Sequence, residues 1–342
     1  MTSATLLEQL RKDLTVDLDS MDPSVAARHG PQGSFRDMTS NQAIAYFEAI
    51  KLERADVVQA AIDYVKSNTP GAAGDAFLQD VVDVLTVLLG KEVYPYLSGN
   101  VHAQTSPSTA YDTEKTIAHA KRLVQLFAVH GIPKERVCVK IPATPQSLVA
   151  CQRLAKESIQ SLATCLFSLP QAVAAVQAGC VYVAPYFNEL RVHFEPALWR
   201  EYEDTGKDHP MCSVIASIVD AFGKIKAKTK VMPASIVTTN EVIALAALHP
   251  DHLTLSPAIL DKLASLSPVS PDSLSRTPTR TSTRSKENTP TFPDYLEDDG
   301  KNLARAIEQD AEVARKLKDA LAIFDEHEQL LKKFIASFTL PK

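Results

Sequence analysis

The sequence predicts an α/β fold, a (β/α)8 barrel of the TIM type with extra helices at its C-terminal end. Short β-like runs alternate with longer helical patterns between residues 14 and 263, which indicates a parallel sheet covered by helices. Eight such runs are found, and eight parallel strands close a barrel of this type. The first run leads into "DLDSMDPS", which lacks the glycines that usually open a doubly wound sheet. The open sheet remains the alternative fold.

Each expected strand is a short, mostly apolar run, and each expected helix is a longer stretch with apolar residues at helical spacing. In chain order, the expected strands are Leu14–Asp19, Ser34–Thr39, Tyr94–Asn100, Val137–Ile141, Leu162–Phe167, Val181–Pro185, Lys230–Ala234 and His252–Leu255. The expected helices are Gln42–Tyr64, Asp75–Leu89, Thr113–His130, Pro145–Lys156, Leu169–Ala178, Pro210–Lys226, Asn240–Leu248 and Pro257–Leu263.

Two later segments depart from this alternation. Residues 265–293 are rich in Ser, Thr, Pro and Arg and poor in apolar residues, so we expect a disordered insertion. Its Ser-Pro and Thr-Pro pairs are candidate phosphorylation sites, although an unregulated, solvated insertion explains them equally well. Residues 298–338 carry apolar residues at near-helical spacing and predict one or two amphipathic helices packed on the barrel. We therefore expect residues 1–342 to form a single domain.

Composition narrows the class of protein. The formal net charge is −5 with both signs mixed along the chain, so neither nucleic acid nor a membrane is an expected partner. No apolar run reaches the roughly 20 residues of a membrane span, and no secretory signal is visible. The five cysteines form no C-x-x-C pair and lie mostly in apolar runs, which is typical of reduced thiols. These observations predict a cytoplasmic protein.

One lysine stands out in "RVCVKIPATPQSL". Lys140 lies in an otherwise apolar strand-like run. Burial disfavours the charged ammonium and lowers the pKa of a lysine from its ordinary value near ~10.4. A neutral amine can attack a ketone or aldehyde and form a Schiff base. The alternative is that Lys140 reaches water from the end of its strand.

Active sites of (β/α)8 barrels lie where the strands end and the helices begin. Asp19 can act there as a general base or simply cap the following helix. Thr164 can hold a catalytic water or only pack in its strand. Asn41 can bind substrate hydroxyls, but capping the helix at Gln42 explains it as well. Further polar residues at strand ends complete the candidate site: Thr39, Asn100, Ser168, Tyr186 and Ser235.

Six segments, in order along the chain, resemble the transaldolase family. They are "VDLDSMDP", "DMTSNQ", "YDTEKTIAHAKRLVQLFAVHGIPKERVCVKIPAT", "LATCLFSLPQAVAAVQAGCVYVAPYF", "KVMPASIVTTNEV" and "HLTLSPAIL". The third segment is the most specific. The resemblance implies a (β/α)8 barrel and a class I aldolase mechanism that needs no metal or other cofactor. It places the Schiff-base lysine at Lys140, the catalytic aspartate at Asp19 and the catalytic threonine at Thr164, and it points to Asn41.

The sequence departs from the family at several functional positions. The family's third strand ends in a glutamate that works through a water molecule, and Asn100 is taken to stand there. The two arginines that bind substrate phosphate in the family fall on Glu189 and Val237. Because phosphate requires fixed cationic donors, these changes predict weak binding of sugar phosphates. Arg191 and His193 are nearby candidates to compensate.

Two further differences concern apolar and aromatic positions. Leu162 stands where the family often has asparagine. Tyr186 replaces a phenylalanine, and the related fructose-6-phosphate aldolases carry an active-site tyrosine that serves as an acid–base group. A phenol near Lys140 can do the same, whereas an aromatic residue at a barrel rim with its hydroxyl in water is the alternative.

These observations predict a class I aldolase or transferase that takes a dihydroxyacetone-type unit from a ketose or ketone, with a non-phosphorylated substrate. An orthodox transaldolase of the pentose phosphate pathway, acting on sedoheptulose 7-phosphate and glyceraldehyde 3-phosphate, is the second hypothesis. A catalytically weakened binding or regulatory protein is the third. The expected partner is a small carbonyl or sugar substrate, and a homodimer is compatible with the family.

Overall fold

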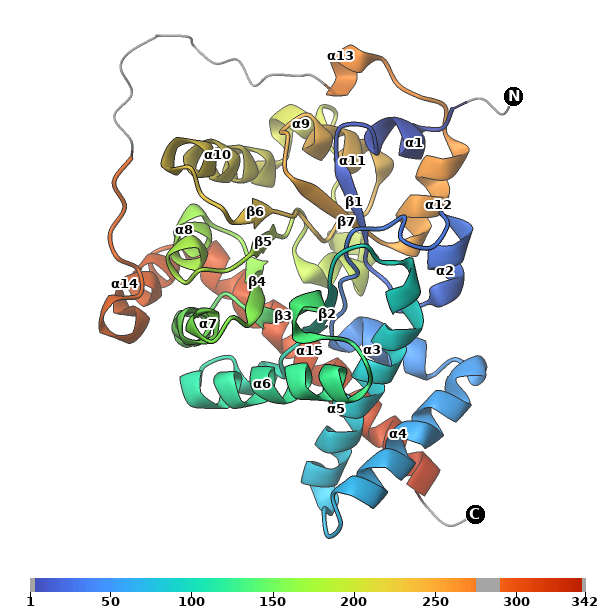
Figure 1. The fold of residues 1–342 in the computed structure, drawn as a ribbon. Helices are drawn as coiled ribbons and strands as arrows, with labels where there is room; N and C mark the ends of the chain where they lie inside the picture. Colours follow the sequence, from blue (N-terminus) through green and yellow to red (C-terminus); the bar gives the residue numbers. More distant parts are fainter. Residues whose placement is uncertain (1–3, 275–289, 340–342) are drawn as a thin grey trace.

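The computed structural model describes residues 4–274 and 290–339 and confirms the α/β barrel (Figure 1). Five parallel strands pair in the order β2-β3-β4-β5-β6, and β1 pairs in parallel with β7. The strands are β1 Thr15–Leu18, β2 Val101–Gln104, β3 Val137–Pro142, β4 Gln160–Leu166, β5 Tyr182–Pro185, β6 Lys230–Val231 and β7 His252–Leu255.

Backbone contacts join the edges of these two sets of strands. On one side, Met38 forms parallel bridges with both Leu18 and Val101, so the segment around it lies between β1 and β2. On the other side, the Asp251 N–H donates to the Val231 carbonyl at 3.1 Å, which connects β7 to β6. The ring therefore has eight positions, as expected. The second is held by isolated bridges where the sequence predicted a regular strand at residues 34–39.

The predicted third strand, Tyr94–Asn100, is wrong. Tyr94–Tyr96 form a 3-10 turn, and β2 begins only at Val101. Pro95 explains the turn, because proline has no N–H for a strand ladder and its fixed φ suits the first turn of a helix. Gly99 lies against Asp37 and Arg36, with too little room there for a side chain. Asn100, which was expected at the end of the predicted strand, therefore lies directly before the start of β2.

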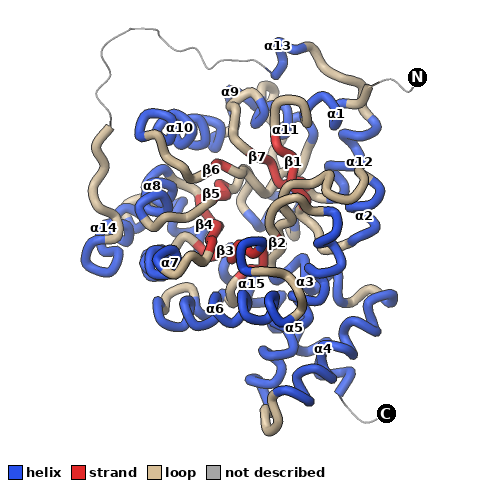
Figure 2. Tube along the Cα trace, viewed as in Figure 1, coloured by secondary structure: helices blue, strands red, loops and turns tan. Residues whose placement is uncertain are grey.

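Helices surround the strands (Figure 2). The helices that follow or flank the strands are α1 Leu6–Leu10, α2 Pro23–Arg28, α3 Gln42–Ala49, α4 Ala55–Asn68, α5 Gly74–Val93, α6 Thr113–Val129, α7 Pro145–Lys156, α8 Leu169–Gln177, α9 Thr205–Asp208, α10 Pro210–Ile225, α11 Thr239–Ala246, α12 Pro257–Ser265 and α13 Pro271–Leu274. The helix predicted at 42–64 is two helices, because the chain turns after α3 through the 3-10 helix Leu52–Arg54. Across this turn Arg54 pairs with Glu48 at 2.6 Å.

The C-terminal region forms α14, Glu297–Glu308, and the long helix α15, Ala311–Thr339. Helix α15 contacts α3, α5 and the 3-10 segment Leu190–His193 that follows β5. Its apolar side is buried through residues such as Leu317 and Phe324. The C-terminal helix therefore lies over the loops at the carboxyl end of the barrel. Most of the insertion predicted at 265–293 falls outside the described residues.

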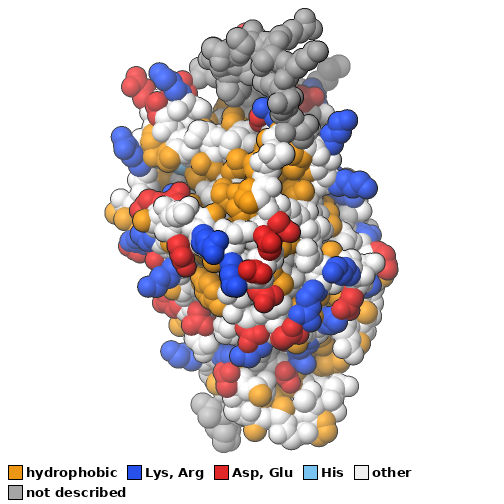
Figure 3. All heavy atoms as spheres, turned by 90° about the vertical axis from the view of Figure 1, so that its left-hand side faces the viewer, with side chains coloured by type: hydrophobic (Ala, Val, Ile, Leu, Met, Phe, Trp, Pro, Cys, Tyr) orange, Lys and Arg blue, Asp and Glu red, His pale blue; other side chains and the backbone are white. Residues whose placement is uncertain are grey.

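The surface of the described chain carries charges of both signs. On the face shown in Figure 3, lysine and arginine side chains are interspersed with aspartate and glutamate. No helix of the described residues is long and apolar enough to cross a membrane. All five cysteines are free and buried, as expected for core thiols.

Candidate active site

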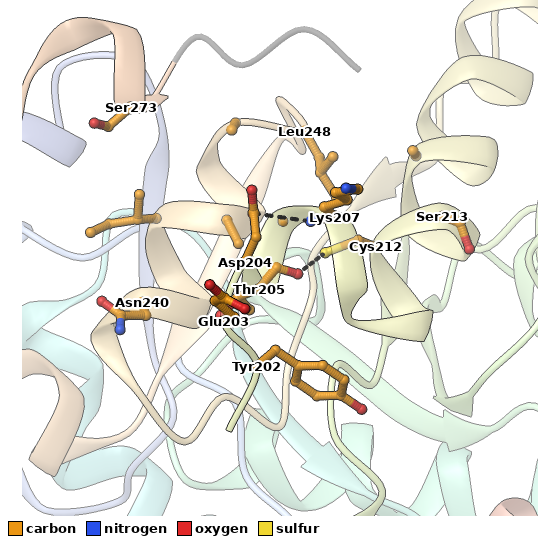
Figure 4. Close-up of a pocket in the computed structure, with 15 residues that line it drawn as sticks. Tyr202, Glu203, Asp204, Thr205, Lys207, Cys212, Ser213, Asn240, Leu248 and Ser273 are labelled. Carbon is orange, nitrogen blue, oxygen red and sulfur yellow. Dashed lines mark hydrogen bonds between the residues drawn. The ribbon is translucent and has the colours of Figure 1, made fainter. Parts of the chain in front are cut away.

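A pocket of about 260 Å³ opens among the residues that end the barrel strands. It is lined by Asp19, Asn41, Ala43, Ile44, Phe47, Lys140, Tyr186, Leu190, His193, Phe194, Ala234, Ser235, Ile236, Thr254, Ser256 and Pro257. A larger hollow of about 680 Å³ lies outside the barrel between α9, α10 and α11 (Figure 4). None of the predicted site residues lines this outer hollow. The smaller pocket is therefore the candidate active site.

Lys140 lies on β3 and reaches this pocket from the barrel interior. Its side chain is only 2% exposed, and it forms no salt bridge with another described residue. Desolvation lowers the pKa of Lys140, and the negative charge of Asp19 partly opposes this shift. The amine is therefore in the environment that favours its neutral, nucleophilic form. The alternative that Lys140 reaches water from the end of its strand is excluded.

Asp19 follows β1 and lines the same pocket. Its Oδ1 accepts a hydrogen bond of 2.6 Å from the Thr39 hydroxyl, which in turn accepts one of 2.6 Å from Thr254. Because Thr39 donates to Asp19 and does not line the pocket, it positions the carboxylate. The structure thus gives Thr39 a supporting contact where the sequence predicted substrate binding.

Thr164 and Tyr186 meet inside the barrel. The Thr164 hydroxyl donates to the Tyr186 phenol oxygen at 3.0 Å, and both side chains are buried. The chain bulges at Cys165, which has a φ of +52°, and this irregularity lies between the β4–β5 pairs. Burial raises the pKa of Tyr186 well above its ordinary value. The phenol therefore keeps its proton at neutral pH and can offer its O–H as a hydrogen-bond donor.

Gln104 occupies the position that the sequence reasoning gave to Asn100. In the parallel register Gln104 pairs with Lys140, so both lie at the same level of the barrel. Asn100 lies four residues before Gln104, directly ahead of β2, and its backbone N–H donates to Asp37. Four residues of strand span about 13 Å, which separates Asn100 from the level of the lysine.

The side-chain amide of Gln104 is buried and has one hydrogen-bond acceptor without a partner. Its Nε2 donates to Gln42 at 2.7 Å, whereas its buried Oε1 has no hydrogen-bond partner. A buried acceptor of this kind is costly unless a water or ligand satisfies it. The proline in "VYPYLSGN" was the signal that this strand begins later than predicted.

The remaining polar candidates divide into two groups. Asn41 lines the pocket, and its Oδ1 caps α3 by accepting from the Ile44 N–H at 3.0 Å, which leaves its Nδ2 donors for other partners. Ser235 also lines the pocket, and its hydroxyl lies 2.9 Å from His193 Nε2. Ser168 caps α8 and does not line the pocket.

The two positions expected to hold phosphate-binding arginines lie beside the pocket without lining it. Glu189 pairs with Arg315 of α15 at 2.7 Å, and Arg315 also contacts Asp319 at 2.8 Å. Val237 donates its backbone N–H to Glu241 at 2.7 Å. Arg191 binds Glu195 and Asp319 and does not line the pocket either. Among the residues that line it, Lys140 is the one lysine and arginine is absent.

The described residues contain no group of three or more His, Cys, Asp or Glu side chains arranged to hold a metal ion.

The family of this chain follows from its similarity to known proteins. The model of the family described as transaldolase/fructose-6-phosphate aldolase matches residues 15–335. This chain belongs to the transaldolase family. A transaldolase of Aliivibrio salmonicida is 32% identical over 259 residues, covering 76% of this chain and 79% of the relative. A transaldolase of Fusarium oxysporum is 32% identical, covering 75% and 77%.

Among solved structures, an IMP dehydrogenase/GMP reductase-like protein of Corynebacterium glutamicum covers 70% of this chain and 62% of its own, with 13% identity and a TM-score of 0.39. This likeness is too weak to inform the fold. Membership of the transaldolase family makes the chain an aldolase or transferase enzyme of carbohydrate metabolism.

Proposed function

We propose that this member of the transaldolase family acts through a Schiff base at Lys140 on a carbonyl substrate that carries no phosphate. The observation that carries the proposal is the pocket lining, in which a buried amine faces a carboxylate while arginine is absent. The family supplies the class of reaction, and the charges of this pocket suggest its substrate.

The described side chains suit each step of such a reaction. The neutral Lys140 amine attacks the donor ketone, and loss of water gives the Schiff base. Asp19 takes the proton of the hydroxyl whose carbon leaves, so that the carbon–carbon bond breaks and an aldehyde departs. The remaining enamine attacks a second aldehyde, or takes up a proton. Water then hydrolyses the Schiff base and restores the amine.

Three groups support these proton transfers. Tyr186 holds a proton at neutral pH and accepts a hydrogen bond from Thr164, and its own O–H can turn from the Cys165 sulfur to the reacting oxygen. Gln104 is level with Lys140 without lining the pocket itself, and its unpaired Oε1 can hold the water of hydrolysis. An amide positions water but cannot take its proton, which leaves that proton to the carboxylate of Asp19.

Phosphate is disfavoured by charge. A phosphate carries close to two negative charges at neutral pH and is usually held by bidentate arginine. Here Glu189 adds a negative charge beside the pocket, and Arg315 is engaged by Glu189, Glu312 and Asp319. A sugar phosphate would meet no free guanidinium among the residues that line the pocket.

An orthodox transaldolase acting on sedoheptulose 7-phosphate and glyceraldehyde 3-phosphate is the second candidate. Its support is that the relatives at about 30% identity are transaldolases. A third candidate, a binding protein without turnover, conflicts with the presence of Asp19 and Lys140 in one pocket and of Thr164 on the Tyr186 side chain that lines it.

Borohydride trapping separates these candidates. The protein is incubated with free dihydroxyacetone or with fructose 6-phosphate, reduced and weighed intact. We expect a covalent adduct on Lys140 with dihydroxyacetone and little with the phosphate ester. Efficient trapping and turnover of the sugar phosphate would favour the orthodox enzyme. Failure to trap any ketone would refute the catalytic proposal.

A further inference from the structure

The outer part of the pocket is apolar and aromatic. Phe47 of α3 and Phe194, just after the 3-10 segment Leu190–His193, both line it, and they are 49% and 37% exposed. Lys140 and Tyr186, at 2% each, lie at its buried end. We call Phe47 and Phe194 the aromatic mouth.

The two rings of the aromatic mouth are held by a third residue. His327 of α15 lies with its ring centroid 5.4 Å from that of Phe47 and 4.7 Å from that of Phe194. The His327 ring is itself fixed, because its Nδ1 donates to the Ile323 carbonyl at 2.7 Å. Figure 1 shows α15 running beside α3, and the two helices are in contact. The C-terminal helix therefore holds both phenyl rings in place before any ligand binds.

The exposed phenyl rings of the aromatic mouth are an apolar surface that a ligand can cover. Eight large apolar side chains of the described chain are exposed, and two of them line the same pocket. The same wall continues inward through the apolar residues Ala43, Ile44, Leu190, Ile236 and Pro257. An apolar tail bound here would remove phenyl and aliphatic surface from water, which is the main source of affinity in such pockets.

The mouth offers little to a charged ligand. His193 lines the pocket next to Phe194, and desolvation lowers the pKa of its imidazole, so that it stays neutral near pH 7. The guanidinium groups of Arg191 and Arg315 are bound to carboxylates and do not line the pocket. An anionic tail would thus lose its hydration without gaining a cationic partner.

We propose that the aromatic mouth is a subsite for the acceptor aldehyde and selects aldehydes with an uncharged, apolar tail. This inference rests on the proposed Schiff-base function, because the donor unit bound to Lys140 fills the buried end and the acceptor enters from the mouth. In the transfer step, the enamine carbon bonds to the aldehyde carbon, the aldehyde oxygen takes a proton, and water releases the product from the lysine.

The test compares acceptors at fixed dihydroxyacetone. Aldol addition is measured with hexanal, with glycolaldehyde and with glyceraldehyde 3-phosphate. We expect the wild-type kcat/KM for hexanal to exceed that for glycolaldehyde by about tenfold or more. Phe47→Ser and Phe194→Ser should each lower the value for hexanal by roughly tenfold, mostly through KM, and change the value for glycolaldehyde by less than about twofold.

The matched control is Leu52→Ser, which removes a side chain that is 92% exposed and does not line the pocket. It should leave all three acceptors unchanged. Borohydride trapping of dihydroxyacetone on Lys140 is run on every variant. If trapping fails in the wild type, the proposed function itself is refuted.

If trapping succeeds but the wild type shows no preference for hexanal, the acceptor subsite alone is refuted. The same follows if glyceraldehyde 3-phosphate is the best acceptor, or if the phenylalanine variants affect all acceptors equally. A second copy of the chain is the other occupant to consider. If Phe47→Ser instead dissociates a dimer in sedimentation velocity without changing acceptor preference, the mouth is an interface and the proposal is overturned.

Discussion

Replacing Lys140 with methionine should change both chemistry and stability, and the two changes are linked. The folded protein holds this lysine with a lowered pKa because the amine is desolvated, whereas the unfolded chain has the ordinary value near ~10.4. At pH values between these two, the unfolded chain binds more protons than the folded one. Stability contributed by this site therefore rises with pH.

The size of the effect follows from the same linkage. Between the folded and unfolded pKa values, the free energy of unfolding of the wild type should rise by about 1.36 kcal/mol per pH unit relative to Lys140→Met. Below the folded pKa the cost of the buried amine is fully present and the difference is constant. Above the unfolded pKa the cost is gone. Methionine fills similar space without the amine, so we expect the variant to be the more stable protein near neutral pH.

The assay is urea unfolding of both proteins at a series of pH values from 6 to about 10. The pH at which the difference curve begins to rise reports the folded pKa of Lys140. The rate of Schiff-base trapping with dihydroxyacetone should show its midpoint at that same pH. If the difference in the free energy of unfolding between the two proteins does not change with pH, the reasoning about this amine is refuted. An adduct that still forms in Lys140→Met would refute it as well.

Further predictions concern the neighbours of the lysine. Tyr186→Phe should lower aldol turnover by roughly 10²–10⁴-fold, the range of a general acid–base group, while dihydroxyacetone is still trapped; unchanged turnover would remove the phenol from the mechanism. Gln104→Leu should slow Schiff-base hydrolysis by about tenfold, measured as accumulation of the adduct in single turnover, since one hydrogen bond to the water is lost. Glu189→Gln should cost about 1 kcal/mol or less in urea unfolding, because its ion pair with Arg315 is partly exposed. A larger loss there would mean that Arg315 is more deeply buried in solution.

Local sequence was enough to place several functional groups. The strand around Lys140 could be recognised because a lysine among β-branched residues is conspicuous and because "PKERVCVKIPAT" has clear ends at a proline and a helix cap. Asn41 was correctly expected to cap a helix. Every second residue of a barrel strand faces inward, and the structure shows that Lys140 belongs to this inward set.

Other assignments needed strand pairing. Asn100 was chosen because the strand before it was placed several residues too early, and only the pairing of Gln104 with Lys140 shows which polar side chain lies level with the amine. Thr39 looked like a ligand-binding residue in the sequence, yet its hydroxyl is used by Asp19. A hydrogen bond between residues on different strands leaves no mark in either segment.

What the sequence by itself determined is the chemistry available: a lysine within an apolar strand, an aspartate after the first strand, and acidic and apolar residues where the family uses arginine. Periodicity and composition suffice for the lysine and the aspartate because they are properties of short segments, whereas the comparison with arginine comes from the resemblance to the transaldolase family. Only the tertiary structure decided which residues from distant parts of the chain surround these groups. Phe47, Phe194 and His327 come from three distant segments, and Arg315 reaches Glu189 across 126 positions of the chain. Contacts at such separation depend on how helices pack on the barrel, which no local pattern encodes.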